Sequence, residues 1–209
     1  MRSRWKPHGL AQSLEEGYYG AQTVTSQIAL SMEHSSGKLI KLGRNLLAGT
    51  DMFSKDVVEV FLTSDDLELR TIGYMLTVNE GNRLEGGPTL ELLDSCAHVL
   101  MDSCQLDLKS DHFSFNRWDC GQELARLFSA VWRFNRERYQ LVLEKIRWVI
   151  GNLWMNGSEE QREAILLGAC EHLFVEPEWR DFFANWRRHA KLRLLFDEAS
   201  ALADKWREL

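Results

Sequence analysis

Residues 57–81, VVEVFLTSDDLELRTIGYMLTVNEG, contain the clearest fold signal in the sequence. Five of the first six side chains are apolar, which predicts a short buried helix ending near Leu62. Ser64 or Asp65 then offers an oxygen that can cap the next helix, and Asp66 suits the positive end of its dipole. Apolar residues recur in that helix with helical spacing up to Gly81. Because the turn between the two helices is so short, they are expected to be antiparallel neighbours.

Helical periodicity continues through most of the remaining sequence. It predicts two helices within residues 23–47 and further helices over residues 88–104, 118–134, 137–155, 158–174, 178–186 and 191–207. In the helix at 137–155, Leu141, Ile146 and Leu153 are expected on the buried face. No segment shows the two-residue alternation of a strand, and only three prolines occur. The predicted fold class is therefore all-α, with antiparallel helix pairs stacked as an α-solenoid or as an irregular helical bundle.

Composition indicates a folded protein. Hydrophobic residues make up 44% and charged residues 27% of the 209 residues, close to the average for soluble globular proteins. We expect one α-helical domain over residues 23–209, preceded by a loosely ordered lead-in over residues 1–22. No apolar run of signal-peptide type or of membrane-spanning length is visible, so a cytoplasmic protein without membrane contact is predicted. The oligomeric state is left open.

The four cysteines are scattered and include no Cys-x-x-Cys pair. All four lie in apolar, helix-like surroundings, where free cysteine behaves as a small buried hydrophobic residue. We therefore predict buried free thiols. The positions concerned are Cys96, Cys104, Cys120 and Cys170.

Residues 61–70, FLTSDDLELR, resemble the inter-helix turn of a HEAT-type repeat, in which an acidic turn precedes an arginine early in the second helix. Residues 155–162, MNGSEEQR, have the same arrangement about two repeat lengths further along. The resemblance implies stacked helix pairs with an extended surface that binds another macromolecule. The alternative is two ordinary helical hairpins within an irregular bundle.

Residues 168–174, GACEHLF, with Phe182, Phe183 and Trp186 after them, are similar to small helical immunity proteins of bacteria. This second resemblance implies a protein that covers and inhibits a toxin.

Few residues suggest catalysis. Asp94, His98 and Asp102 fall at i, i+4 and i+8, where they could charge the imidazole or hold a metal, but charged residues are expected on that solvent-facing ridge in any case. Cys120 with His112 as its base would form a nucleophile pair. The sequence lacks an HExxH helix, a phosphate-binding glycine loop and a GxSxG elbow. We therefore predict no catalytic residue, no metal site and no cofactor.

Charge is distributed unevenly along the chain. Residues 51–104 contain eleven acidic side chains against three basic ones. An acidic surface repels nucleic acid and attracts basic proteins, so a basic protein partner is predicted, the alternative being a solvated face that aids solubility. The predicted partner-binding residues are Asp65, Asp66, Glu68, Glu91, Asp94 and Asp102.

A second possibility concerns the basic C-terminal region. Its arginines alternate with Trp179 and Trp186, a combination that suits nucleic acid, although Glu176, Glu178 and Asp181 dilute the positive charge. The candidate nucleic-acid-binding residues are Arg180, Arg187, Arg188, Lys191 and Arg193.

Overall fold

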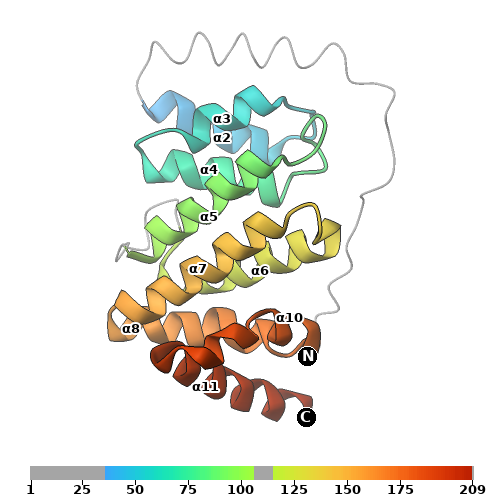
Figure 1. Ribbon diagram of the computed structural model, residues 1–209. Helices are drawn as coiled ribbons and strands as arrows, with labels where there is room; N and C mark the ends of the chain where they lie inside the picture. Colours follow the sequence, from blue (N-terminus) through green and yellow to red (C-terminus); the bar gives the residue numbers. More distant parts are fainter. Residues whose placement is uncertain (1–35, 106–114, 209) are drawn as a thin grey trace. The chain divides into compact units, whose positions relative to one another are not determined.

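The computed structural model describes residues 36–105 and 115–208, and within these ranges it confirms the all-α prediction (Figure 1). These ranges contain no strand, only an isolated bridge between Phe53 and Leu84. The lead-in over residues 1–22 and the first helix expected after it lie outside the described residues. The helices are α2 (Ser36–Ala48), α3 (Lys55–Leu62), α4 (Leu67–Val78), α5 (Leu90–Gln105), α6 (Arg117–Asn135), α7 (Gln140–Asn156), α8 (Glu159–Glu163), α9 (Glu171–Leu173), α10 (Pro177–Phe182) and α11 (Ala190–Arg207).

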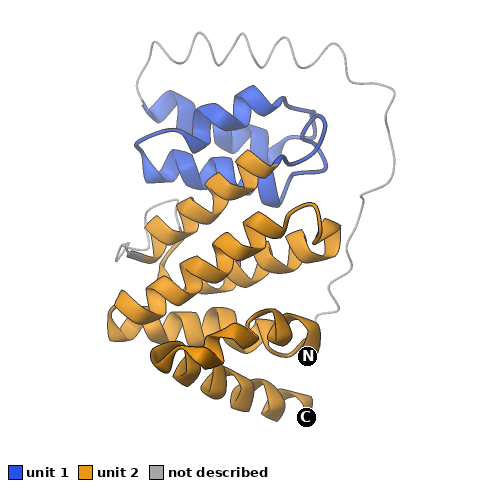
Figure 2. Cartoon of the chain, viewed as in Figure 1, with its two compact units in different colours: residues 1–89 blue, residues 90–209 orange. Residues whose placement is uncertain are grey.

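The chain divides into two compact units, which Figure 2 shows in different colours. The described part of unit 1 is residues 36–89, and that of unit 2 is residues 90–105 and 115–208. Each unit has its own buried apolar residues. The expected single domain over residues 23–209 stays a prediction.

Unit 1 is built on the α3–α4 pair that residues 57–81 predict. α3 ends at Leu62 and α4 begins at Leu67, so the four residues 63–66 form the turn between the two helices. The N-cap is Asp66, whose Oδ1 accepts a hydrogen bond from the Glu68 amide at 2.8 Å, whereas Ser64 or Asp65 was predicted. Ser64 Oγ instead accepts a hydrogen bond from the backbone amide of Asp66, the N-cap residue, at 3.1 Å.

A buried arginine fixes the loop that follows α4. Arg83 donates to the carbonyl oxygen of Leu46 at 2.9 Å and to that of Asp51 at 2.9 and 3.1 Å. Its Nη1 pairs with Glu80 at 3.2 Å. One side chain thus joins the end of α2 to the loop after α4, and it satisfies carbonyl groups that a helix end leaves open.

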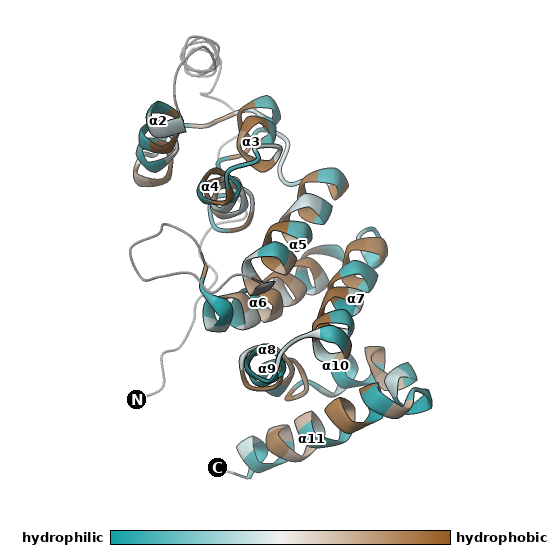
Figure 3. Ribbon diagram, turned by 90° about the vertical axis from the view of Figure 1, so that its left-hand side faces the viewer, coloured by the Kyte–Doolittle hydropathy of each residue, from teal (hydrophilic) through white to brown (hydrophobic). Residues whose placement is uncertain are grey.

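In unit 2, α5, α6 and α7 run antiparallel in succession. A disulfide between Cys104 and Cys120 holds the end of α5 beside the start of α6, and a short turn at residues 136–139 reverses the chain into α7. Because of these two reversals, α5 and α7 are parallel to each other, and they are in contact. Figure 3 shows them on one side of the unit, with α6 and residues 159–173 on the other.

The predicted helix over residues 158–174 is present but is not uniformly α-helical. Its predicted capping box is confirmed, since Ser158 accepts from the Gln161 amide and the Gln161 side chain accepts from the Ser158 amide. Residues 164–170 then form a π-helical turn. This turn lies directly against α6: a Cβ added to Gly121 would come within 2.3 Å of the Ala164 carbonyl oxygen.

Aromatic side chains fill the interior between α6 and the C-terminal helices. Phe183 packs against Phe128 at 5.4 Å and against Trp186 at 4.6 Å between ring centroids. Phe174 contacts Phe196 of α11 at 5.0 Å. The predicted helix over residues 178–186 is in fact α10 followed by a 3-10 helix at Ala184–Arg188, which brings Trp179 and Trp186 into this cluster.

Candidate interaction surfaces

The six predicted partner-binding residues fall into two groups, one in each unit. The unit 1 group surrounds the α3–α4 turn and the unit 2 group lies on α5. The first comprises Asp65, Asp66 and Glu68, and the second comprises Glu91, Asp94 and Asp102.

In unit 1, two of the three acidic side chains have structural partners. Asp66 caps α4, and Glu68 pairs with Arg44 of α2 at 2.7 Å. Asp65 is exposed and, among the residues that the structure describes, forms no ion pair. The Glu68 charge is therefore already compensated, whereas the Asp65 charge is exposed.

In unit 2, the three acidic residues lie on one side of α5, opposite the buried Leu93 and Leu100; Glu91 is exposed, and Asp94 and Asp102 are half-buried. Asp94 Oδ2 lies 3.4 Å from His98 Nδ1. The sixteen residues of α5 include no lysine or arginine, so this helix carries three negative charges without a permanent positive charge of its own. We call Glu91, Asp94 and Asp102 the acidic ridge.

The alternative role of Asp94, His98 and Asp102 as a metal site receives no structural support from the described ranges, where no group of three or more His, Cys, Asp or Glu side chains is placed to hold a metal ion. His112, the base of the other suggested pair, lies outside those ranges.

Sequence reasoning missed an exposed apolar ridge on α7. Leu141 was expected in the core, yet it is 77% exposed, and Trp148 two turns further along is 52% exposed. Lys145 places its Nζ 5.0 Å from the centroid of the Trp148 ring. The seven-residue spacing of Leu141 and Trp148 is the signal that could have shown this second face, because Val142, Ile146 and Val149 already fill the first. We call Leu141 and Trp148 the apolar ridge.

The five candidate nucleic-acid-binding residues of the C-terminal region differ in how far they are exposed. Arg180 donates to the Phe174 carbonyl oxygen and pairs with Asp204 at 2.7 Å, so it is engaged within the fold. The same hydrogen bond lowers the pKa of the Asp204 carboxyl. Arg187, which stacks over the Phe196 ring, and Arg188, Lys191 and Arg193 are exposed.

The aromatic part of the nucleic-acid hypothesis is wrong. Trp179 is 8% and Trp186 4% exposed, so neither indole can stack on a base. Both rings pack inward, Trp179 against Phe128 and Trp186 against Phe174 and Phe183. What remains is a basic cluster of four side chains, Arg187, Arg188, Lys191 and Arg193.

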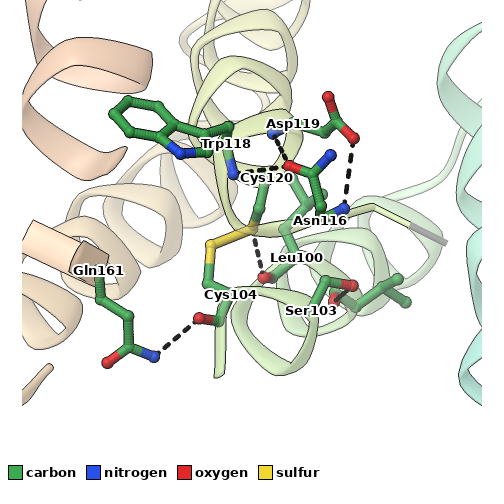
Figure 4. The surroundings of a disulfide bond; sticks show 9 residues. Leu100, Ser103, Cys104, Asn116, Trp118, Asp119, Cys120 and Gln161 are labelled. Carbon is green, nitrogen blue, oxygen red and sulfur yellow. Dashed lines mark hydrogen bonds between the residues drawn. A yellow bond between two sulfur atoms is a disulfide. The ribbon is translucent and has the colours of Figure 1, made fainter. Parts of the chain in front are cut away.

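The prediction of four free thiols is correct for Cys96 and Cys170 and wrong for Cys104 and Cys120, which form a disulfide (Figure 4). Their Cα atoms lie 5.7 Å apart because α5 ends where α6 begins. The disulfide leaves Cys120 without a thiol for nucleophilic chemistry. Burial raises the pKa of the Cys170 thiol far above its usual value.

The surroundings of the disulfide are ordered by hydrogen bonds (Figure 4). Asn116 caps α6 by accepting from the amides of Trp118 and Asp119, and Gln161 Nε2 donates to the Cys104 carbonyl oxygen at 2.7 Å. The end of α5, the start of α6 and residues 159–173 are thereby joined at one place.

Comparison with known proteins finds no matching family model, no matching curated protein and no matching solved structure. Within the described ranges, no helix is both long enough and apolar enough to cross a membrane. Function therefore has to be inferred from the surfaces themselves.

Proposed function

We propose that this chain is a protein-binding module that acts without catalysis and docks a basic protein through an acidic face. The observation that supports the proposal is the acidic ridge: three carboxylates, exposed at Glu91 and half-buried at Asp94 and Asp102, on one side of a helix that contains no lysine or arginine. Asp65, exposed at the α3–α4 turn, adds a further negative charge. Charges placed in this way speed the approach of a basic partner more than they strengthen the final complex.

The stacked antiparallel helices of unit 2 are compatible with a helical repeat fold and give such a protein an extended surface. In its sharpest form, the proposal is that of a HEAT-like immunity protein in the cytoplasm of a bacterium, covering a basic toxin such as a nuclease. The two sequence resemblances motivate this form.

Affinity capture from a cell lysate tests the proposal. The tagged full chain is incubated with lysate at about 50 mM and about 500 mM NaCl, between which surface charges become strongly screened. We expect one basic protein to be retained at low salt and lost at high salt. Retention should also fall with Asp65→Lys and Asp94→Lys. The matched control is Asp197→Lys, which reverses an exposed acidic residue on α11.

Retention of the same protein by all three variants, or retention that does not change with salt, would show that the acidic residues are not the docking site. No retained protein at either salt concentration would contradict the proposed function as a whole.

Nucleic-acid binding is the second candidate, and the exposed basic cluster is the observation that favours it. No acidic residue lies between Arg187 and Arg193. In this case, Arg187→Glu with Arg188→Glu should weaken binding to a labelled single-stranded oligonucleotide and should flatten its salt dependence. Equal binding by the variant and the wild-type chain would remove this candidate.

A further inference from the structure

The outer face of α11 is centred on an exposed leucine. Figure 3 shows this helix at one end of unit 2, where it buries Leu195 and Phe196. Leu194 lies on the other side of the helix and is 61% exposed. Ala190 and Ala201, which lie on the same line along the helix, are also exposed and are small. A second helix can therefore approach this line closely until it meets Leu194.

Four exposed charged side chains flank Leu194. The two that precede it are basic and the two that follow it are acidic, so the sign of the charge reverses at the leucine. None of the four forms an ion pair or a side-chain hydrogen bond with another described residue, so their charges are not compensated within that part of the fold. They are Lys191, Arg193, Asp197 and Glu198.

The four side chains form two pairs of opposite sign, one on each flank of Leu194. At 100° per residue, Lys191 and Glu198 lie about 60° and about 40° to one side of Leu194. Arg193 and Asp197 lie about 100° and about 60° to the other side. Along the axis, Lys191 lies about 4.5 Å before Leu194 and Glu198 about 6 Å after it. Each flank therefore has one basic residue before the leucine and one acidic residue after it.

This arrangement is complementary to itself when a second copy of the helix runs antiparallel. A two-fold axis at Leu194 places the same flank of both helices side by side, as in any isologous contact. Lys191 of each copy then lies within about 1.5 Å, along the axis, of the level of Glu198 of the other. Arg193 lies within about 3 Å of the level of Asp197, and the long lysine and arginine side chains span these offsets.

Charge complementarity selects a second copy over other occupants. Nucleic acid or a uniformly acidic protein meets Asp197 and Glu198 as like charges, and a uniformly basic protein meets Lys191 and Arg193 in the same way. A matching partner needs charges that reverse along its length at the same spacing. An antiparallel copy of α11 has this pattern.

We infer that α11 is a self-association surface through which two copies of this chain form an antiparallel dimer with two-fold symmetry. Leu194 packs against Leu194 of the second copy, and the ion pairs on both flanks fix direction and register. A single helix face buries less area than a standard interface, so the dimer is weak, with a dissociation constant on the order of 100 µM. The inference goes beyond the proposed function and does not depend on it.

Sedimentation equilibrium of the purified full chain tests the dimer. Measurements run from about 10 µM to about 1 mM protein, a range that brackets the expected dissociation constant, in about 50 mM NaCl. We expect the weight-average mass to rise with concentration from 24.3 kDa towards twice that value. In about 500 mM NaCl, the dissociation constant should rise by about three- to tenfold, because salt screens the ion pairs.

Charge reversal on one flank gives a sharper test. Lys191→Glu leaves two acidic residues on that flank and Glu198→Lys leaves two basic ones, so each variant alone should dimerise at least about tenfold more weakly. Mixed in equal amounts, the two variants should form a heterodimer of nearly wild-type strength, because every charge on this flank then meets its opposite. Misfolding of either variant could not produce this recovery.

Two exposed leucines provide a matched pair of variants. Leu194→Asp brings two carboxylates together at the two-fold axis and should abolish the dimer. Leu141→Asp, on the apolar ridge of α7, is the control and should dimerise like the wild-type chain. Asp197→Lys should weaken the dimer and still retain the basic protein in the capture experiment, which separates this inference from the proposed function.

Three results would each overturn the inference. The first is a mass of 24.3 kDa at every concentration. The second is a mixture of Lys191→Glu and Glu198→Lys that stays monomeric. The third is a dimer that survives Leu194→Asp but is lost with Leu141→Asp. If any of these appeared while a basic protein was still captured in a salt-dependent manner, the proposed function would stand and only the dimer would be wrong.

Discussion

Reduction of the Cys104–Cys120 disulfide should destabilise unit 2 by an amount that follows from the length of the loop it closes. The two cysteines are separated by 16 positions in the sequence. Closing a loop of about 15 residues restricts the unfolded chain enough to stabilise the folded state by about 3 kcal/mol at 25 °C. We expect a loss of this size when the disulfide is reduced.

Tryptophan fluorescence during urea unfolding is the appropriate assay. Apart from Trp5, every tryptophan of the chain lies in residues 90–209, and residues 36–89 contain none. The signal therefore reports on unit 2. With an m-value of about 2 kcal/mol per M, a loss of about 3 kcal/mol lowers the urea midpoint by about 1.5 M.

The control is a Cys104→Ala, Cys120→Ala variant, whose midpoint should not respond to reductant. A thiol count on the urea-unfolded chain checks the pairing itself: two free thiols, Cys96 and Cys170, before reduction and four after it. Four thiols before reduction would refute the disulfide. Two thiols with an unchanged midpoint would refute the loop-entropy reasoning.

Three further predictions concern packing and charge. Gly121→Ala should destabilise unit 2 by about 1–3 kcal/mol, because the added Cβ would clash with the backbone of the π-helical turn. Gly151→Ala is the control and should be tolerated, because its Cβ would meet no atom closer than 3.5 Å. Equal urea midpoints for the two variants would contradict this prediction. Arg83→Met should cost unit 1 about 2–3 kcal/mol by leaving buried carbonyl groups without donors, and an unchanged thermal unfolding curve by circular dichroism would count against it. Asp204 should stabilise the fold relative to Asp204→Asn at neutral pH, because only the ionised carboxylate forms an ion pair with Arg180. This stabilisation should disappear as the pH falls through the lowered pKa of Asp204, and a difference between the two proteins that is independent of pH would disprove it.

Local sequence signals predicted the helices well. The apolar spacing around Leu69 and the capping pair Ser158 and Gln161 depend on neighbours within one or two turns, and both reappear in the structure. The cap of α4 was predicted at Ser64 or Asp65 but lies at Asp66, one or two residues later, since three polar side chains compete for the same role at that turn.

The errors arose where packing between distant segments decides the outcome. The disulfide depends on the end of α5 meeting the start of α6, which no local pattern of Cys104 or Cys120 encodes. Leu141 fits a helical stripe, but α7 has more apolar residues than its buried face accommodates. Trp179 and Trp186 alternate with arginines in the sequence, but contacts with Phe128 and Phe183 bury their rings.

The disulfide also bears on the predicted cytoplasmic location. Stable disulfides are typical of oxidising compartments and are uncommon in the cytoplasm. The thiol count described above, made on protein isolated from its native source with free thiols blocked at lysis, would therefore also test the location. Four blocked thiols would agree with a cytoplasmic protein, and two would agree with an oxidising compartment.

The most direct test of the central claim is the association rate between the chain and the basic protein that it captures, measured by stopped-flow fluorescence across a range of salt concentrations. Electrostatic docking on the acidic residues predicts a rate that falls steeply as salt rises, and a slower, less salt-dependent rate for Asp94→Lys than for the Asp197→Lys control. An association rate that is independent of salt and equal in both variants would contradict the claim.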